Sequence, residues 1–329
     1  MKAILVGKNK ELLWSDVPDP ILAEDEVLVK VEYAALNRAD LMQREGDYPP
    51  PPGCPEWMGL EVSGEIVAMT EGAKEKSDYK IGSKVCALLG GGGYAEYVAV
   101  KYDMCMPVPE NTSMVEAAAI PEAYATAYLK LFVEGKAKAG DTLLMQAGAS
   151  GLASVIIPLA KSFGLRVITT VIRDPESIAH LGADLVVNTK EESLAEVLKK
   201  EEEAGRAVDI AIDCLGGKML GECLPYVKYG CRWIVIAALA GAEATIDLKT
   251  IYKKNIRIVG STLRSRTPEM KASILSSLVK EVWPRVASGE VKPTIYKVLP
   301  IEEAEAAHAI LYRGENVGKV VLEVKKENR

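Results

Sequence analysis

Short apolar runs alternate with amphipathic segments through the middle of the chain. Runs of the kind that form buried strands lie at 141–147, 166–171, 184–187, 208–213, 231–238 and 256–261. Helical spacing lies between them, as in the segment that Asp174-Pro175 opens and in the charged segment 191–204. This alternation predicts a doubly wound parallel sheet, a Rossmann domain, over residues 121–264.

The two ends of the chain have a different pattern. Short runs that often alternate apolar with polar residues predict strands at 2–6, 12–17, 26–34, 63–69, 83–88 and 94–100. Beyond residue 266 the spacing predicts helices over 268–288 and 301–312, and strands at 294–298 and 319–324. We therefore expect residues 1–120 and 265–329 to form one partly antiparallel β domain, with the Rossmann domain inserted and a ligand cleft between them.

The first chemical signal is the turn that follows the run 141–147. It reads Gly148-Ala149-Ser150-Gly151-Leu152, and a helical pattern follows it until Gly164. Small residues at a helix N-terminus let backbone amides approach a pyrophosphate. A G-x-G-x-x-G fingerprint would have glycine at Ser150 and Ala153, so an ordinary strand–turn–helix connection stays open from this turn alone. The repeated strand–helix units after it favour dinucleotide binding.

Composition and charge narrow the class of protein. The net charge of −6 and the scattered Lys and Arg residues give no support for a nucleic-acid or membrane partner. No apolar stretch is long enough to span a bilayer, and Met1-Lys2 leads into a strand pattern rather than a signal peptide. The six cysteines include no C-x-x-C pair, which favours reduced thiols and a cytoplasmic location.

Several motifs in order resemble the zinc-free quinone oxidoreductase branch of the medium-chain dehydrogenase/reductase superfamily. They are Ala35-Leu-Asn-Arg-Ala-Asp-Leu-Met-Gln-Arg44, Gly46-Asp-Tyr-Pro-Pro-Pro-Pro-Gly53, Gly59-Leu-Glu-Val-Ser-Gly64, Gly91-Gly-Gly-Tyr-Ala-Glu-Tyr97, Ile120-Pro-Glu-Ala123 and Leu263-Arg-Ser-Arg266. The resemblance spans the chain from Met1 to Val324. It implies that the first domain is GroES-like and catalytic, and that the chain forms a homodimer.

Residues that bind zinc in other members of the superfamily are missing. Zinc-dependent relatives have Cys where Asn37 stands, His where Leu60 stands, and a lobe with four cysteines. This chain has two histidines, His180 and His308, for which we expect surface or helix-capping roles. A catalytic zinc normally takes three protein ligands from His, Cys and carboxylates. We therefore expect no metal site.

Chemistry without a metal suits hydride transfer to an electron-poor carbon, because the cofactor supplies the hydride and the protein aligns the reactants. The resemblance makes Asn37 and Tyr48 the candidate catalytic residues. Asn37 would bind a substrate or ribose oxygen, and Tyr48 would place its hydroxyl near the reacting face. Asn37 as a plain turn residue and Tyr48 packed on Pro49–Pro52 remain alternatives. The slot is expected to favour flat, uncharged quinones or enones, with Leu263 on its other side.

The resemblance also supplies a set of cofactor-binding residues. Thr126 would hold the nicotinamide carboxamide; the full set is Tyr48, Thr126, Ala149, Ser150, Gly151, Leu152, Arg173, Lys190, Ile236, Thr262, Leu263 and Asn316. The second Rossmann strand is followed by Arg173, while Asp174 suits a helix cap, so we expect NADPH rather than NADH. Arg173 as a merely solvated residue remains open.

The expected function is NADPH-dependent reduction of a quinone or similar acceptor. Two alternatives stay open: an enone or 2-alkenal reductase, and a non-catalytic NADPH-binding redox sensor or crystallin-like protein. Dimer formation is expected through the run 256–261, which reads as an edge strand of the Rossmann sheet.

Overall fold

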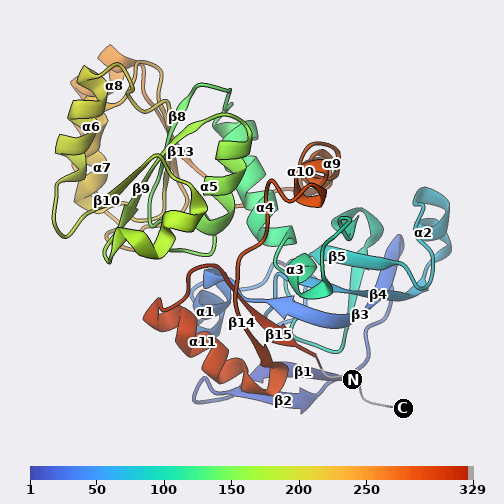
Figure 1. Ribbon diagram of the computed structural model, residues 1–329. Helices are drawn as coiled ribbons and strands as arrows, with labels where there is room; N and C mark the ends of the chain where they lie inside the picture. Colours follow the sequence, from blue (N-terminus) through green and yellow to red (C-terminus); the bar gives the residue numbers. More distant parts are fainter. Residues whose placement is uncertain (325–329) are drawn as a thin grey trace. The chain divides into compact units, whose positions relative to one another are not determined.

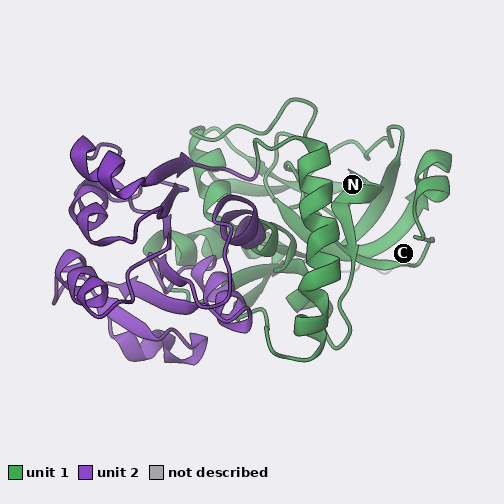
Figure 2. Cartoon of the chain, turned by 90° about the horizontal axis from the view of Figure 1, so that it is seen from above, with its two compact units in different colours: residues 1–125, 264–329 green, residues 126–263 purple. Residues whose placement is uncertain are grey.

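A computed structural model describes residues 1–324. The chain divides into two compact units (Figure 1, Figure 2). Unit 1 comprises Met1–Ala125 and Arg264–Arg329, and unit 2 comprises Thr126–Leu263. The first division falls inside helix α4 (Pro121–Tyr128), a few residues after the expected boundary. No helix within residues 1–324 is long and apolar enough to cross a membrane.

Unit 2 is built on one parallel sheet. Its six strands lie in the order β10-β9-β8-β11-β12-β13. Their bounds are β8 Thr142–Met145, β9 Arg166–Val171, β10 Leu185–Asn188, β11 Ile210–Asp213, β12 Arg232–Val235 and β13 Arg257–Gly260. After β8 the chain adds strands on one side, and then returns to add β11 to β13 on the other. The expected doubly wound sheet is confirmed, and its topological switch point lies at β8.

Helices cover the unit 2 sheet because the strands are apolar on both faces. Leu144, Ile168, Ala211 and Trp233 pack against side chains of α6 and α7, while α5 contacts β8 and β9 (Figure 1). The helical segments are a π-helix at Leu129–Glu134, α5 Ala153–Ser162, η3 Pro175–Leu181, α6 Leu194–Glu203, α7 Gly217–Cys223, η4 Leu224–Tyr226 and α8 Leu248–Lys254. Asp174 caps η3 as expected, since its side chain accepts a hydrogen bond from the Glu176 amide at 3.0 Å.

Unit 1 contains a largely antiparallel sheet in the order β14-β15-β3-β4-β5-β7, with β6 also paired to β3 and a separate hairpin β1-β2. The strands are β1 Lys2–Val6, β2 Leu12–Asp16, β3 Glu26–Ala35, β4 Glu61–Met69, β5 Lys84–Leu88, β6 Tyr97–Lys101, β7 Cys105–Pro107, β14 Ile295–Pro300 and β15 Lys319–Glu323. The C-terminal strand β15 pairs antiparallel with β3, so the end of the chain does return to the first sheet. The GroES-like fold is confirmed.

Short helices join these strands. They are α1 Arg38–Glu45, α2 Glu71–Lys76, η1 Tyr102–Met104, α3 Met114–Ala118, α4, α9 Pro268–Glu281, α10 Trp283–Ala287, η5 Ile301–Glu303 and α11 Ala304–Arg313. The single helix expected over 268–288 is wrong, because it breaks at Val282. Pro284, two residues later, lacks the amide hydrogen that would continue the helix.

Candidate functional site

The turn after β8 presents unused backbone amides to solvent at the switch point of the unit 2 sheet. No hydrogen bond within residues 1–324 uses the amides of Ala149, Gly151 or Leu152. The Ser150 hydroxyl instead accepts from the Ala153 amide at 3.1 Å, which caps the start of α5. A dinucleotide phosphate at this position would meet several donors and the positive end of the α5 dipole.

Close packing of the turn requires a residue without a side chain at position 148. A Cβ built at Gly148 would lie 2.5 Å from Thr169 Oγ1 and 2.8 Å from Ile178 Cδ1. The Gly148 amide donates to the Thr170 carbonyl at 2.7 Å, and the Thr170 hydroxyl accepts from the Ala147 amide at 3.0 Å. The turn is therefore anchored on β9, although its spacing departs from the usual fingerprint.

Two basic residues follow the strands next to this turn. Arg173 lies two residues beyond β9 and is partly exposed, and Lys190 lies two residues beyond β10 and is exposed. Because β10, β9 and β8 are adjacent and parallel, both positions lie at the same edge of the sheet as the Gly148 turn. This is the edge where the adenosine end of a dinucleotide binds in such sheets.

The remaining cofactor candidates fall on other elements. Ile236 follows β12, while Thr262 and the buried Leu263 follow β13, so all three share the same sheet edge. Thr126 lies on α4 at the start of unit 2. Asn316 belongs to unit 1, where its amide donates to the Gly318 carbonyl at 2.7 Å. Most of the candidate cofactor-binding residues therefore lie in unit 2, whereas Asn316 and Tyr48 lie in unit 1.

Ser261, directly before Thr262, is held by a buried pair of charges that the sequence analysis missed. Lys130 and Glu134 lie on the π-helix, with Nζ and Oε2 3.7 Å apart. Lys130 donates to the Ser261 hydroxyl, which donates to Glu134 Oε1 at 2.6 Å. The contacts fix the end of β13.

Unit 1 contains a buried network of charged groups around Asn37. Lys319 Nζ lies 2.7 Å from Glu61 Oε1 and donates to Asn37 Oδ1 at 2.7 Å and to the Leu36 carbonyl at 2.7 Å. Asn37 Nδ2 donates to Glu61 Oε1 at 3.0 Å. Both ends of the Asn37 amide are therefore engaged, and its proposed contact with a ligand oxygen stays a prediction.

A second carboxyl, Asp40, completes the N-terminus of α1. It accepts from the Asn37 amide at 2.7 Å, the Gly59 amide at 3.2 Å and the Tyr94 hydroxyl at 3.0 Å. Desolvation raises the pKa of Asp40 to about 6, against the opposing effect of these hydrogen bonds. The position of Asp40, three residues after Asn37, was the available sequence signal for this capping role.

Glu122, on the first turn of α4, joins the same network. Its amide donates to Glu61 Oε2 at 2.8 Å. Desolvation, together with the charge of Glu61, raises the pKa of Glu122 to about 7, while the charges of Lys319 and Lys271 lower it. We call Asn37, Asp40, Glu61, Glu122 and Lys319 the carboxyl cluster.

Tyr48 is held by Arg264, whose guanidinium carbon lies 4.7 Å from the centre of the phenol ring. Arg264 also donates to the Tyr48 carbonyl at 3.1 Å, to Gln43 Oε1 at 2.8 Å and to the Gly90 carbonyl at 2.7 Å. Desolvation raises the pKa of the Tyr48 phenol; the Arg264 charge lowers it and the Glu122 charge raises it. Two charged residues, Arg264 and Glu122, therefore act on Tyr48.

Comparison with known proteins assigns both units of the chain to one family. Residues 151–280 match the family model of the zinc-binding dehydrogenases, and residues 23–110 match that of the alcohol dehydrogenase GroES-like domain. The chain is 30% identical over 334 residues to quinone oxidoreductase of Rattus norvegicus, covering 98% of this chain and 97% of that protein. The chain belongs to the medium-chain dehydrogenase/reductase family, in its quinone oxidoreductase branch.

Solved structures agree with this assignment. The quinone oxidoreductase of Thermus thermophilus, described in complex with NADPH, is 31% identical with a TM-score of 0.80 over 98% of this chain and 100% of that one. A mycobacterial protein complexed with NADPH is 25% identical with a TM-score of 0.84 over 98% and 100% of the two chains. This medium-chain reductase is an oxidoreductase that uses a nicotinamide cofactor.

The family model's zinc does not fit the residues of this medium-chain reductase. No group of three His, Cys, Asp or Glu side chains within residues 1–324 is placed to hold a metal ion. At the position that resembles the zinc centre of relatives, the Lys319 ammonium already neutralises Glu61, and Asn37 offers an amide. The donor set lacks the nitrogen and sulfur ligands that zinc prefers.

His308 differs from the expectation of a surface or capping role, which is wrong for this residue. It is 1% exposed on α11, and neither ring nitrogen has a hydrogen-bond partner among the described residues. Its ring meets Tyr94 edge-on, with centroids 5.9 Å apart at 77°. Desolvation lowers the pKa of His308 to about 4, and the Arg44 charge acts in the same direction. His180, by contrast, is exposed in the last turn of η3.

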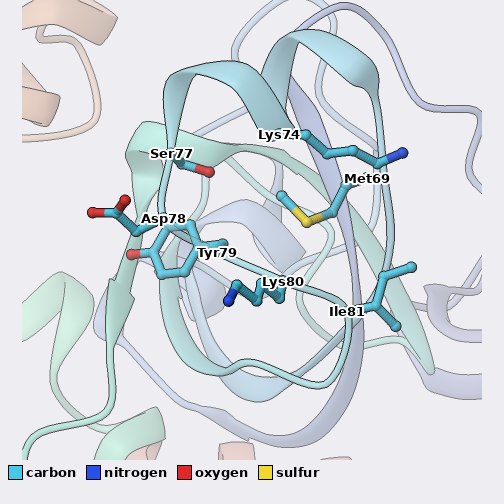
Figure 3. A pocket seen from close by; sticks show the side chains of 7 residues that line it. All are labelled: Met69, Lys74, Ser77, Asp78, Tyr79, Lys80 and Ile81. Carbon is cyan, nitrogen blue, oxygen red and sulfur yellow. The ribbon is translucent and has the colours of Figure 1, made fainter.

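A separate hollow of about 710 Å³ lies at α2 in unit 1 (Figure 3). It shares no residue with the carboxyl cluster; Met69, Lys74, Ser77, Asp78, Tyr79, Lys80 and Ile81 line it. The Ser77 hydroxyl donates to the Ala73 carbonyl and the Tyr79 hydroxyl to the Cys105 carbonyl. These hydroxyls brace the wall of the hollow rather than converge on a ligand.

His308 predicts a specific pH dependence of stability. An unfolded histidine titrates near pH 6.5, so the folded pKa of about 4 is depressed. The contribution of the neutral His308 to the free energy of unfolding is fully present above the unfolded pKa. It is lost as the pH drops towards 4, and the free energy of unfolding falls by about 2 kcal/mol between pH 7 and pH 5. His308→Leu should remove this part of the loss in urea unfolding, while His180→Leu should keep it. Equal pH dependence in all three proteins would contradict the assignment.

Proposed function

We propose that this chain reduces quinones, or acceptors equally poor in electrons, with NADPH as the hydride donor. The observation that carries the proposal is the carboxyl cluster, in which Lys319 rather than a metal ion neutralises Glu61. Without a Lewis acid to polarise a carbonyl, the acceptor must itself be electrophilic, and quinones meet this requirement. The names of the relatives support the same substrate class.

Each unit has a defined task in this proposal. The amides of Ala149, Gly151 and Leu152 would hold the pyrophosphate, and Thr126, Ile236, Thr262 and Leu263 would hold the nicotinamide end. The bound cofactor supplies a hydride. Tyr48, ordered by Arg264, would donate a hydrogen bond to the acceptor oxygen. Asn37, held by Glu61 and Lys319, would bind a substrate or ribose oxygen. The protein thus contributes mainly positioning.

Oxidation of NADPH with a panel of quinones and enones tests the proposal. We expect turnover with quinones, unchanged after prolonged chelation, and slower turnover with enones or 2-alkenals. A faster rate with enones would favour the second candidate function, which the same geometry allows. Tight NADPH binding without turnover of any acceptor would favour a non-catalytic redox-sensor or crystallin-like role. A cytoplasmic location is part of the proposal.

The cofactor preference depends on Arg173 in this proposal. A guanidinium at the end of β9 can pair with a 2′-phosphate, which NADH lacks, and Lys190 adds a second positive charge. Arg173→Ala should raise the KM for NADPH about tenfold or more and leave that for NADH nearly unchanged. Arg313→Ala, which changes an exposed arginine of unit 1, should alter neither value. Equal KM values for both cofactors in the native protein would contradict NADPH specificity.

Tyr48→Phe should lower kcat modestly, by less than about tenfold, because it removes a single hydrogen bond. A loss of roughly a hundredfold or more, with unchanged cofactor binding, would instead identify Tyr48 as an obligatory proton donor. Steady-state kinetics with a saturating quinone measure the difference. Tyr312→Phe, at a residue that is 80% exposed, is the matched control.

Assembly into a homodimer through β13 is also proposed. This strand is last in the sheet order, and Ile258 on it is 41% exposed. Pairing of two such edges would bury unpaired backbone groups and apolar side chains. Light scattering at micromolar concentration should give twice the chain mass, and Ile258→Lys should reduce it to one chain mass. A native protein with one chain mass would refute the dimer.

A further inference from the structure

Arg264 is a buried cation that has no carboxylate partner in the part of the chain that the structure describes. Two lysines there, Lys130 and Lys319, are equally buried, and each forms an ion pair with a glutamate. Arg264 is 7% exposed, yet no carboxylate oxygen within residues 1–324 lies at ion-pair distance from it. Burial of a charge without a counter-ion is costly, so the place of this charge in the molecule calls for a reason.

Neutral oxygen atoms hold the guanidinium of Arg264 in one orientation. It donates to the Tyr48 carbonyl at 3.1 Å, to Gln43 Oε1 at 2.8 Å and to the Gly90 carbonyl at 2.7 Å. Gln43 is itself fixed, because its amide nitrogen donates to the Glu56 carbonyl at 2.8 Å. These dipoles orient the cation but do not cancel its charge. A full positive charge therefore remains at a defined position within unit 1.

The phenol of Tyr48 lies directly against this charge. The guanidinium carbon is 4.7 Å from the ring centre. No hydrogen bond within residues 1–324 uses the Tyr48 hydroxyl, and the residue is partly exposed, so this hydroxyl is available to a ligand. Desolvation raises the pKa of the phenol, and the Arg264 charge opposes that effect. A cation against the ring makes the O–H group a stronger hydrogen-bond donor.

We propose that Arg264 is a positioning residue of the reaction, which orients the Tyr48 hydroxyl and polarises it towards negative charge on the acceptor oxygen. This inference rests on the proposed function. Hydride transfer oxidises the nicotinamide and reduces the quinone to a hydroquinone anion, which then takes a proton from solvent. Tyr48 keeps its own proton and stabilises the anion through its hydrogen bond. A charge that is already fixed in place needs no reorganisation when the anion forms.

Two variants separate the charge of Arg264 from its shape. Arg264→Lys keeps the positive charge but loses the planar fork of donors, whereas Arg264→Gln loses both. With a saturating quinone, kcat should fall about threefold for the lysine variant and about sixfold for the glutamine variant, with an unchanged KM for NADPH. Arg313→Gln makes the same change at an exposed arginine of unit 1 and should keep the native kcat. Circular dichroism checks that each variant is folded.

A series of quinones of decreasing electron affinity tests the effect of the charge. A weaker quinone gives a more basic hydroquinone anion, which gains more from a polarised donor. Single-turnover rates of hydride transfer should therefore show a loss for Arg264→Gln that increases along the series. A loss of the same size with every quinone would identify a purely structural role and would overturn the inference.

A double-mutant cycle shows whether Arg264 acts through Tyr48. The hydroxyl is absent in Tyr48→Phe, so either change at Arg264 should then alter kcat by less than about 1.5-fold. Losses as large as those in the native background would also overturn the inference, while leaving quinone reduction intact. The lysine variant alone decides the cycle if the glutamine variant does not fold. Absence of turnover in the native protein with every acceptor would instead refute the proposed function.

Discussion

The buried ion pair between Lys319 and Glu61 is the interaction on which the rest of unit 1 depends. The two groups are 2.7 Å apart and almost completely buried, so removing either would leave an uncompensated charge, at a cost of about 3–5 kcal/mol. The pair joins β15 from the end of the chain to β4 from its first third, and Asn37 adds the N-terminus of α1. The return of the chain to the first sheet is thus fixed by electrostatics as well as by strand pairing.

The same pair explains why the chemistry proposed here needs no metal. An ammonium group supplies one positive charge in a fixed place, but it cannot coordinate a carbonyl as a Lewis acid does. The cluster therefore stabilises the fold, and in the proposed reaction the reducing power comes from the nicotinamide.

Arg264 has a comparable organising role for Tyr48. Its guanidinium joins α1 through Gln43, the loop of Tyr48 and the loop of Gly90, and its carbon stacks on the phenol. A planar fork with several donors can satisfy all of these partners at once, which a lysine could not do. The position of Tyr48 is therefore set by a residue that lies far away from it in the sequence.

Sequence alone determined the parallel sheet, its order of strands and helices, the Gly148 turn and the family, because these depend on local hydrophobic periodicity and on contiguous motifs. It also indicated Asn37 and Tyr48 as site residues, whose roles remain predictions. Tertiary structure decided what surrounds them. The contacts of Lys319, Asp40 and Glu122 and the stacking of Arg264 on Tyr48 join segments that are far apart in the sequence, and no local sequence pattern links such segments. It also decided that His308 is buried, with no hydrogen-bond partner among the described residues, since the packing of α11 against Tyr94, rather than the residue type, sets its exposure.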